Sequence, residues 1–237
     1  MNKDKIIIPL DVDSAAKAVA LVETLKDDVG AFKVGLELIN SAGFAIFDEI
    51  KQAGAGKIFY DCKLHDIPNT VAGASRAIAR LGVWMFNVHC SGGFEMMKAA
   101  KLAATEASEQ LGVNPPAVIG VTVLTSIDQL VLNDEMKVSG SVANLVVHFA
   151  RLAQDAGLDG VVASPHEIEL IRAACGDDFM IVTPGVRPTG GDIGDQKRVL
   201  TPKEAVDRGA DYLVIGRPIT KAENPKTAAQ TIAANIS

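Results

Sequence analysis

The chain has 237 residues, of which 48% are hydrophobic and 22% charged, and its formal net charge is -6. This acidic balance argues against general binding to nucleic acid or to anionic membranes. No run reaches the roughly 18 apolar residues of a membrane span, and the N-terminal residues lack a signal-peptide pattern. The three cysteines (Cys62, Cys90 and Cys175) fit neither a disulfide framework nor a zinc site, so we expect a cytoplasmic protein.

Short apolar runs that are typical of strands alternate with helical patterns along the whole chain. Val142, Leu145, Val146, Phe149 and Leu152, for example, show the three- and four-residue spacing of an amphipathic helix. Two further helices are predicted to begin after the capping residues of Ser164-Pro165-His166-Glu167 and Thr201-Pro202-Lys203-Glu204. The predicted strands are Ile6–Asp11, Ala31–Val34, Lys57–Asp61, Met85–His89, Ala117–Val121, Gly160–Ala163, Met180–Thr183 and Tyr212–Ile215.

Near-continuous apolar strands that alternate with helices indicate a parallel sheet covered on both sides. Eight such units in a chain of this length favour a closed (β/α)8 TIM barrel, formed by residues 1–237 as a single domain. A doubly wound open sheet is the alternative, but no G-x-G-x-x-G pattern follows the first strand.

The carboxyl ends of the predicted strands carry charged residues, and barrels of this kind keep their active sites at that end. Asp11 ends the first strand, Lys33 lies in the second, and Asp61 ends the third, two residues before Lys63. Side chains alternate along a strand, so Asp61 and Lys63 are predicted to face the same way. The pattern therefore predicts one pocket with two acids and two lysines, although a purely structural ion pair would leave the same pattern.

Lysines flanked by aspartates are kept protonated, which argues against a Schiff-base aldolase, whose lysine must lose its proton. A protonated lysine is suited to act as a general acid that donates a proton to carbon. Lysines interleaved among the acids would also repel a divalent cation, so we predict no metal site.

The loops after the seventh and eighth strands are predicted to bind phosphate, which is their recurrent role in these barrels. Arg187 follows the seventh strand, and Gly216 and Arg217 follow the eighth. Glycine lets backbone N–H groups approach an anion, and arginine matches its oxygens with a planar fork. The polar run that contains Gly190-Gly191 and ends at Gln196 is predicted to be a mobile lid.

The segment after the fifth strand offers hydroxyl groups for the polar edge of a ring. Thr122, Thr125 and Ser126 are the candidates, and Ser126 fits equally well as the cap of the following helix. His65, in contrast, is expected to have a packing or hydrogen-bonding role.

Taken together, these residues resemble the orotidine 5'-phosphate decarboxylases of the bacterial type over nearly the whole chain. Related magnesium-dependent 3-keto-L-gulonate-6-phosphate decarboxylases and hexulose-phosphate synthases share the D-x-K-x-x-D pattern but carry an acid where this chain has Lys33. The motifs that support the resemblance are Leu10-Asp11, Phe32-Lys33-Val34-Gly35, the run from Asp61 to Thr70, the run from Val121 to Ser126, Pro184-Gly185-Val186-Arg187-Pro188 and Ile215-Gly216-Arg217-Pro218-Ile219.

The resemblance implies a lyase that decarboxylates orotidine 5'-monophosphate to UMP without a cofactor, in the last step of pyrimidine biosynthesis. It also implies a homodimer in which Asp66 and Thr70 reach the partner's site. Lys63 would protonate C6 of the pyrimidine within a catalytic network of Lys33, Asp61, Lys63 and Asp66. The substrate-binding residues that it implies are Asp11, Lys33, Thr70, Thr125, Ser126, Pro184, Arg187, Gln196, Gly216 and Arg217.

Two other functions stay open at this point. One is a magnesium-dependent sugar-phosphate decarboxylase or aldol lyase on the same barrel, which would lose its activity on chelation. The other is a barrel that binds phosphate without catalysis, which would bind UMP yet leave orotidine monophosphate unchanged.

Overall fold

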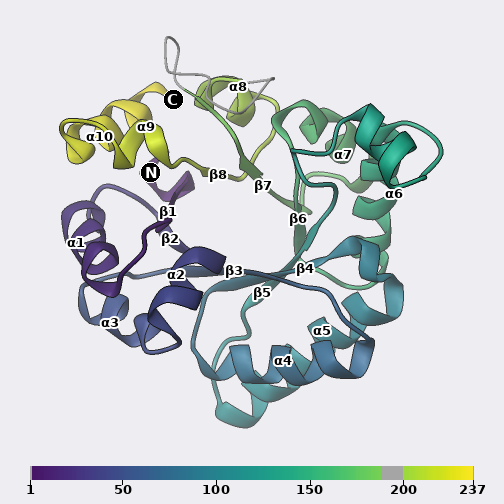
Figure 1. Ribbon diagram of the computed structural model, residues 1–237, viewed down its shortest axis with the longest axis horizontal. Coiled ribbons are helices and arrows are strands. Elements are labelled where there is room, and N and C mark those ends of the chain that lie inside the picture. The colour runs from purple at the N-terminus through teal and green to yellow at the C-terminus, as the bar shows by residue number, and fades with distance from the viewer. Residues whose placement is uncertain (1, 188–199, 237) are drawn as a thin grey trace.

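The computed structural model, which describes residues 2–187 and 200–236, has eight parallel strands that close into a barrel in chain order (Figure 1). Each strand pairs with the next one in the sequence, and the last pairs with the first. The predicted (β/α)8 barrel is therefore confirmed, and each predicted strand is present. The strands are β1 (Ile6–Pro9), β2 (Ala31–Val34), β3 (Ile58–Leu64), β4 (Met85–His89), β5 (Ala117–Val121), β6 (Gly160–Val162), β7 (Met180–Pro184) and β8 (Tyr212–Val214).

The helices surround the ring of strands, which Figure 1 shows from one end of the barrel. The α-helices are α1 (Ala15–Leu25), α2 (Leu36–Ala42), α3 (Ile46–Gln52), α4 (Pro68–Arg80), α5 (Phe94–Leu111), α6 (Val142–Asp155), α7 (Ile168–Cys175), α8 (Pro202–Asp207), α9 (Arg217–Thr220) and α10 (Pro225–Asn235). Shorter turns are the 3-10 helices η1 (Asn2–Lys5), η2 (Cys90–Gly92) and η4 (Pro165–Glu167) and the π-helix η3 (Val131–Glu135).

Both predicted capping sequences begin a helical segment. The Thr201 hydroxyl accepts a hydrogen bond from the Glu204 N–H at 3.2 Å, and the Glu204 carboxylate accepts one from the Thr201 N–H at 2.8 Å. Ser164 and Glu167 form the same reciprocal box, but there the first turn is η4, and α7 begins only at Ile168. Each box satisfies backbone groups that a helix start would otherwise leave unpaired.

Alternation of side chains along the strands gives the molecule two apolar layers. Residues that face outward, such as Ile8 and Phe86, join the helices in the larger core. Residues that face inward fill the barrel itself; they are Ile7, Ala31, Phe59, Met85, Ile119 and Val182. The barrel interior is therefore packed, as is usual for this fold, and leaves space for a ligand only at its ends.

Aromatic side chains fill the end of the barrel at which the strands begin. The rings of Trp84 and Tyr212 meet edge to face with centroids 5.0 Å apart, and the Lys57 ammonium lies 5.0 Å from the centre of the Trp84 ring. Such pairs contribute beyond the area that they bury, which stabilises this end as a floor.

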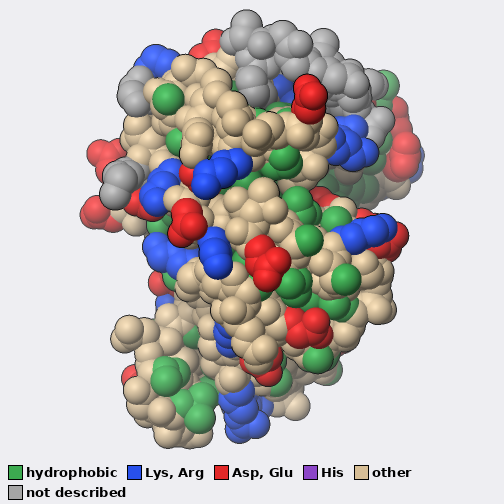
Figure 2. Space-filling model, turned by 90° about the vertical axis from the view of Figure 1, so that its left-hand side faces the viewer, with side chains coloured by type: hydrophobic (Ala, Val, Ile, Leu, Met, Phe, Trp, Pro, Cys, Tyr) green, Lys and Arg blue, Asp and Glu red, His purple; other side chains and the backbone are tan. Residues whose placement is uncertain are grey.

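The side of the molecule shown in Figure 2 carries both signs of charge among scattered hydrophobic side chains. Figure 2 shows acidic and basic side chains interspersed on the side of the molecule formed by α1, α3 and α10. Among the described residues, no helix is both long enough and apolar enough to cross a bilayer.

We predict that Phe86→Ala lowers the free energy of unfolding by about 3–5 kcal/mol, the usual cost of deleting a buried phenyl group. Phe86 is fully buried on the helix-facing side of β4, where a cavity would remain. The matched control is Leu102→Ala on α5, which is 51% exposed and should change stability by only about 0.5 kcal/mol. Urea unfolding followed by circular dichroism measures both, and equal midpoints for the two variants would contradict the assignment of Phe86 to the core.

Candidate active site

Asp61 stands between two lysines at the carboxyl end of the barrel. Its Oδ2 atom lies 3.2 Å from the Lys33 ammonium, and its Oδ1 atom lies 2.6 Å from the Lys63 ammonium. Lys33 also reaches Asp11, at 3.3 Å, so the four charges form one continuous chain of opposite signs. The structure thus brings the two acids and two lysines from the ends of the first three strands into one cluster.

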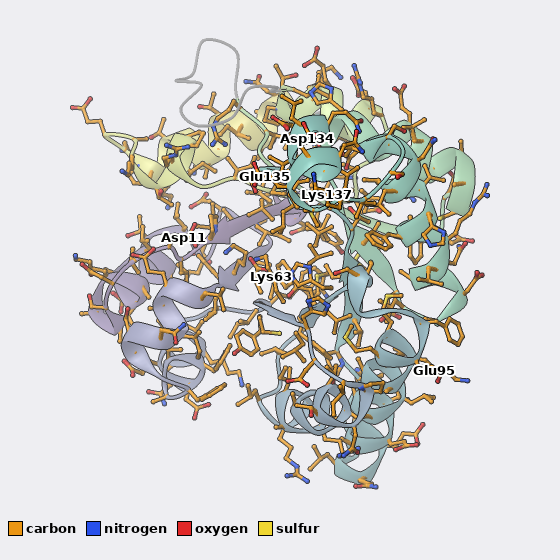
Figure 3. All side chains as sticks on the ribbon, turned by 45° about the vertical axis from the view of Figure 1, so that its right-hand side comes forward. Asp11, Lys63, Glu95, Asp134, Glu135 and Lys137 are labelled. Carbon is orange, nitrogen blue, oxygen red and sulfur yellow. The ribbon has the colours of Figure 1, made fainter. Side chains whose placement is uncertain are left out.

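These charged side chains belong to the inward-facing positions of adjacent strands. Lys33 on β2 and Asp61 on β3 are each only 9% exposed. Gly35, just after β2, leaves room for the lysine, since a Cβ atom there would lie 2.8 Å from the Lys33 ammonium. Figure 3 shows Lys63 near the centre of the ring of strands, with Asp11 to one side of it and Glu95 at the periphery.

Asn87 is a member of this site that the sequence analysis missed. It is fully buried on β4, and its amide NH₂ donates a hydrogen bond to Asp61 Oδ1 at 2.7 Å. Its amide oxygen accepts a hydrogen bond from the backbone N–H of Lys63, also at 2.7 Å. The available signal was a single amide in the apolar run Met85-Phe86-Asn87-Val88, at an inward-facing position.

The backbone of Lys63 is in the left-handed region, with φ of 48°. For a residue other than glycine this conformation costs about 1–3 kcal/mol and persists only where the surroundings impose it. It coincides with a shift in the register between β3 and β4, from the Tyr60–Phe86 pair to the Leu64–Val88 pair. The contact between Lys63 and Asp61 therefore depends on an irregular strand end, as well as on the alternation of side chains.

Opposite charges decide the ionisation of Asp61. Burial alone would raise the pKa of its carboxyl group, but the ammonium groups of Lys33 and Lys63 outweigh this effect. Hydrogen bonds from Lys63 and Asn87 act in the same direction, so the pKa lies below its ordinary value. At neutral pH, Asp61 is a carboxylate.

A cavity of about 200 Å³ lies beside this charged chain. Lys33, Asp61 and Lys63 line one part of it, while Thr125 after β5 and Pro184 at the end of β7 line others. Most of the remaining lining is aliphatic. The cavity can accept a flat apolar ring with polar edges, with the charged groups on one side of it.

A larger and more open depression of about 410 Å³ lies at the opposite end of the barrel. Two of its charged groups already have structural partners: Lys57 lies over the Trp84 ring, and Asp211 forms an ion pair with Arg172. We therefore place the site at the end that carries Asp61, although the depression is larger.

Two arginines lie beyond the ends of β7 and β8. Arg187 is partly buried, and both burial and the nearby Arg217 guanidinium lower its pKa. No carboxylate within residues 2–187 and 200–236 forms an ion pair with either guanidinium. Gly216 lets the chain pass close to β1, because a Cβ atom there would lie 3.0 Å from Pro9 Cγ. Two like charges held close together in this way are suited to bind an anion.

The structure does not bring every predicted site residue into the pocket of the single chain. Asp66 and Thr70 are exposed, and the Asp66 carboxylate accepts a hydrogen bond from the Ile67 N–H. Ser126 is exposed outside the cavity, and the buried Thr122 hydroxyl is already bound to the Val162 carbonyl at 2.9 Å. Thr122 is thus not available as the ring-binding group that the sequence suggested. Gln196 and the predicted lid around Gly190-Gly191 lie outside the described residues.

Two histidines and a cysteine lie next to the pocket. His65 has a ring neighbour, His89, with centroids 5.3 Å apart, and burial, His65 and Lys63 lower the pKa of His89. Burial raises the pKa of Cys62 to about 12, and its thiol donates to the Asn87 carbonyl at 3.3 Å. A thiol in that environment is a poor nucleophile.

No group of three or more His, Cys, Asp or Glu side chains suited to a metal ion occurs within the described part of the chain. The space between Asp11 and Asp61, which two carboxylates could offer to a cation, is taken by the Lys33 ammonium. The charge chemistry of this pocket therefore comes from its lysines.

The comparisons with known proteins agree on one family. The model of the "Orotidine 5'-phosphate decarboxylase / HUMPS family" matches residues 4–232. The chain is 55% identical to an orotidine 5'-phosphate decarboxylase of Moorella thermoacetica, over 99% of this chain and 92% of that protein. It is 52% identical to one of Heliobacterium modesticaldum, over 97% and 94%. A crystal structure of the enzyme from Lactobacillus acidophilus matches with a TM-score of 0.86 at 37% identity, over 98% of each chain.

We predict that Asp61 links stability to pH. Because its pKa is lower in the folded chain, its charged form stabilises the fold above the unfolded pKa of about 3.9, and this contribution is lost as the pH falls through the folded pKa. The free energy of unfolding of the wild type, minus that of Asp61→Asn, should therefore decrease between about pH 6 and about pH 3. Urea titrations of both proteins measure this difference, and a difference that does not vary with pH would exclude a lowered pKa.

Proposed function

The chain belongs to the orotidine 5'-phosphate decarboxylase / HUMPS family, and we infer that it converts orotidine 5'-monophosphate to UMP and CO₂. One observation supports decarboxylation most directly. Asp61 binds the Lys63 ammonium at the wall of a cavity that is large enough for a nucleobase. Decarboxylation leaves an electron pair on carbon, and an ammonium group beside that carbon both stabilises the charge and supplies the proton.

Lys63 is the proposed general acid. The bond between C6 and the carboxylate breaks, the electron pair stays on C6, and CO₂ leaves. Lys63 then transfers a proton from Nζ to C6, which gives UMP, and the resulting amine takes a proton from water. Asp61 holds the ammonium in place for this step at a contact of 2.6 Å.

Lys33 and Asp11 complete the network and bind the ribose hydroxyl groups. Their contact of 3.3 Å leaves the Asp11 side chain 58% exposed, so its oxygens can accept hydrogen bonds from a ligand. Lys33 is nearly buried and contacts Asp61 as well, which links the ribose subsite to the reacting carbon.

Arg187, Gly216 and Arg217 bind the phosphate, with Gln196 added from the loop between β7 and α8. The two guanidinium groups are close enough for one to lower the pKa of the other, and an anion between them relieves that repulsion. Binding energy from this remote group can be used to hold the pyrimidine against Lys63. Thr125 contacts the polar edge of the ring, and Pro184 lines the same cavity. Ser126 lies outside the cavity in the single chain, so a contact between Ser126 and the ring edge would need this segment to move inward on binding.

The magnesium-dependent reaction of related barrels is the second candidate, and one residue discriminates against it. A metal that bridges Asp11 and Asp61 would have to displace the Lys33 ammonium from contacts of 3.3 Å and 3.2 Å. We therefore propose that catalysis needs no metal or other cofactor, and that excess EDTA leaves the decarboxylation rate unchanged.

We propose that the active form is a cytoplasmic homodimer in which Asp66 and Thr70 complete the site of the partner subunit. Both are exposed, and so is the large aliphatic side chain of Ile67 between them, at 67%, so this stretch is accessible for packing against a second chain. The free thiols of Cys62, Cys90 and Cys175 are compatible with a reducing compartment.

We predict that Lys63→Ala lowers kcat by at least about 100-fold, because general acid catalysis contributes at least that much. UMP should still bind, since its phosphate is held by Arg187 and Arg217. The matched control is Lys101→Ala, which removes another lysine from a contact of 2.6 Å to an aspartate, Asp159, away from the cavity. The loss of orotate absorbance measures turnover, and calorimetry measures UMP binding. Turnover at the wild-type rate in Lys63→Ala would refute the proposed role.

The dimer proposal predicts that two inactive variants complement each other. In a mixture of Lys63→Ala and Asp66→Ala chains, each hybrid dimer has one site with an intact Lys63 and an intact Asp66 from the partner. Random reassociation should restore about one quarter of the wild-type activity. If Asp66 acted in its own subunit, the mixture would be as inactive as its components.

A further inference from the structure

Asn87 occupies a special place in the pairing of β3 with β4. Tyr60 pairs with Phe86 and Leu64 pairs with Val88, so Asn87 alone lies opposite the segment from Asp61 to Lys63. It contacts each residue of that segment: its side chain binds Asp61 and the Lys63 N–H, and its carbonyl accepts from the Cys62 thiol. One residue of β4 therefore holds the whole irregular end of β3.

An amide of this length satisfies both neighbours at once at any pH. The Asp61 carboxylate requires a donor, and the Lys63 N–H requires an acceptor, so the orientation of the Asn87 amide follows from its partners. A carboxylate at this position would repel Asp61, and an aliphatic side chain would remove one donor from Asp61 and leave the Lys63 N–H without its acceptor beside a fully buried position.

The two hydrogen bonds act on the two groups that carry the chemistry. Asn87 and Lys63 both bind Oδ1 of Asp61, at 2.7 Å and 2.6 Å, which leaves Oδ2 facing Lys33. The bond to the Lys63 N–H satisfies that group in its left-handed conformation, from which the side chain turns back onto Asp61. Loss of Asn87 would therefore free both the rotation of the carboxylate and the backbone of the lysine.

We infer that Asn87 is a positioning residue of the decarboxylation, which fixes the Asp61 carboxylate and the Lys63 backbone so that the ammonium faces C6. This inference rests on the proposed function. Asn87 acts through Asp61 and Lys63 and lies on β4, which is across the closed barrel from β8, the strand that precedes Arg217. It should therefore govern kcat far more than the binding of UMP.

The test compares Asn87→Leu, which removes both hydrogen bonds but keeps the branched shape and the number of heavy atoms of the side chain, with the wild type. The expected result is a fall in kcat of roughly 10- to 100-fold, the effect of one or two hydrogen bonds to a charged group. UMP affinity should stay within about threefold, because the phosphate contacts are unchanged. The matched control is Thr183→Val on β7, a buried strand residue that faces the helices and whose hydroxyl has no partner among the described residues.

The pH dependence of kcat separates positioning from a general loss of folding. Asn87→Leu removes a donor that helps to keep the pKa of Asp61 low, so the acid limb of the profile should move to higher pH. The charged and titratable groups that face Asp61 are Lys33 from β2, Lys63 from β3 and His89 from β4. The pH profile of kcat for His89→Gln identifies any part of the pH dependence that comes from titration of His89.

The pH dependence of kcat in Asn87→Asp should be opposite to that in Asn87→Leu. A protonated Asp at this position can donate to Asp61 while its carbonyl oxygen accepts from the Lys63 N–H, so this variant should approach wild-type kcat at low pH. It should lose activity as the pH rises and the proton shared by the two carboxyl groups is released. A side chain that matters only for folding would produce neither pattern.

A crystal structure of Asn87→Leu gives a readout that is independent of activity. The contact between Lys63 and Asp61 Oδ1 should be lost or lengthened. Wild-type kcat and pH profile in both Asn87 variants, or an unchanged Lys63–Asp61 contact in that structure, would overturn the inference. Failure of the wild-type protein to decarboxylate orotidine monophosphate would instead refute the proposed function, and the crystal structure would still decide whether Asn87 positions Asp61 and Lys63.

Discussion

The Asp61 carboxylate is the group on which the whole site depends, since its two oxygens bind different cations. Oδ2 faces Lys33, while Oδ1 accepts from both Lys63 and Asn87. A carboxylate that is only 9% exposed would be costly to bury alone, and these partners are what keep it charged. Lys33 and Lys63 are in turn held on either side of one anion, so two like charges share a small volume with a defined geometry.

The barrel produces this geometry because its strands form a closed ring and because successive side chains alternate between its inner and outer faces. Residues at inward-facing positions of β2, β3 and β4 converge because neighbouring strands are hydrogen-bonded in chain order. The aliphatic and aromatic side chains below them fill the interior, so the polar groups meet only at the carboxyl end. Arg187 and Arg217, for which we propose phosphate binding, follow β7 and β8 at the same end of the barrel. In this proposal, a rigid scaffold separates binding of the anion from chemistry at the carbon.

Much of this could be predicted from the sequence, because it depends on periodicities. Apolar runs predicted the strands, and the two-residue spacing of Asp61 and Lys63 predicted a shared face. Asn87 was not predicted, because a single amide within an apolar strand forms no spacing pattern that would indicate its partners. The left-handed Lys63 is an irregularity imposed by β4, which no local pattern encodes. Asp66 and Thr70 are exposed in the single chain, and the role that we propose for them needs a second subunit, so neither the local sequence nor one chain decides it.

A crystal structure of the protein with bound UMP tests the central claim most directly. The account predicts that C6 of the pyrimidine lies about 3–3.5 Å from Lys63 Nζ, the separation of a reactive pair, with the Lys63–Asp61 contact intact. It also predicts that the phosphate lies between Arg187 and Arg217. A ring bound with C6 away from Lys63, or a phosphate remote from both guanidinium groups, would contradict it.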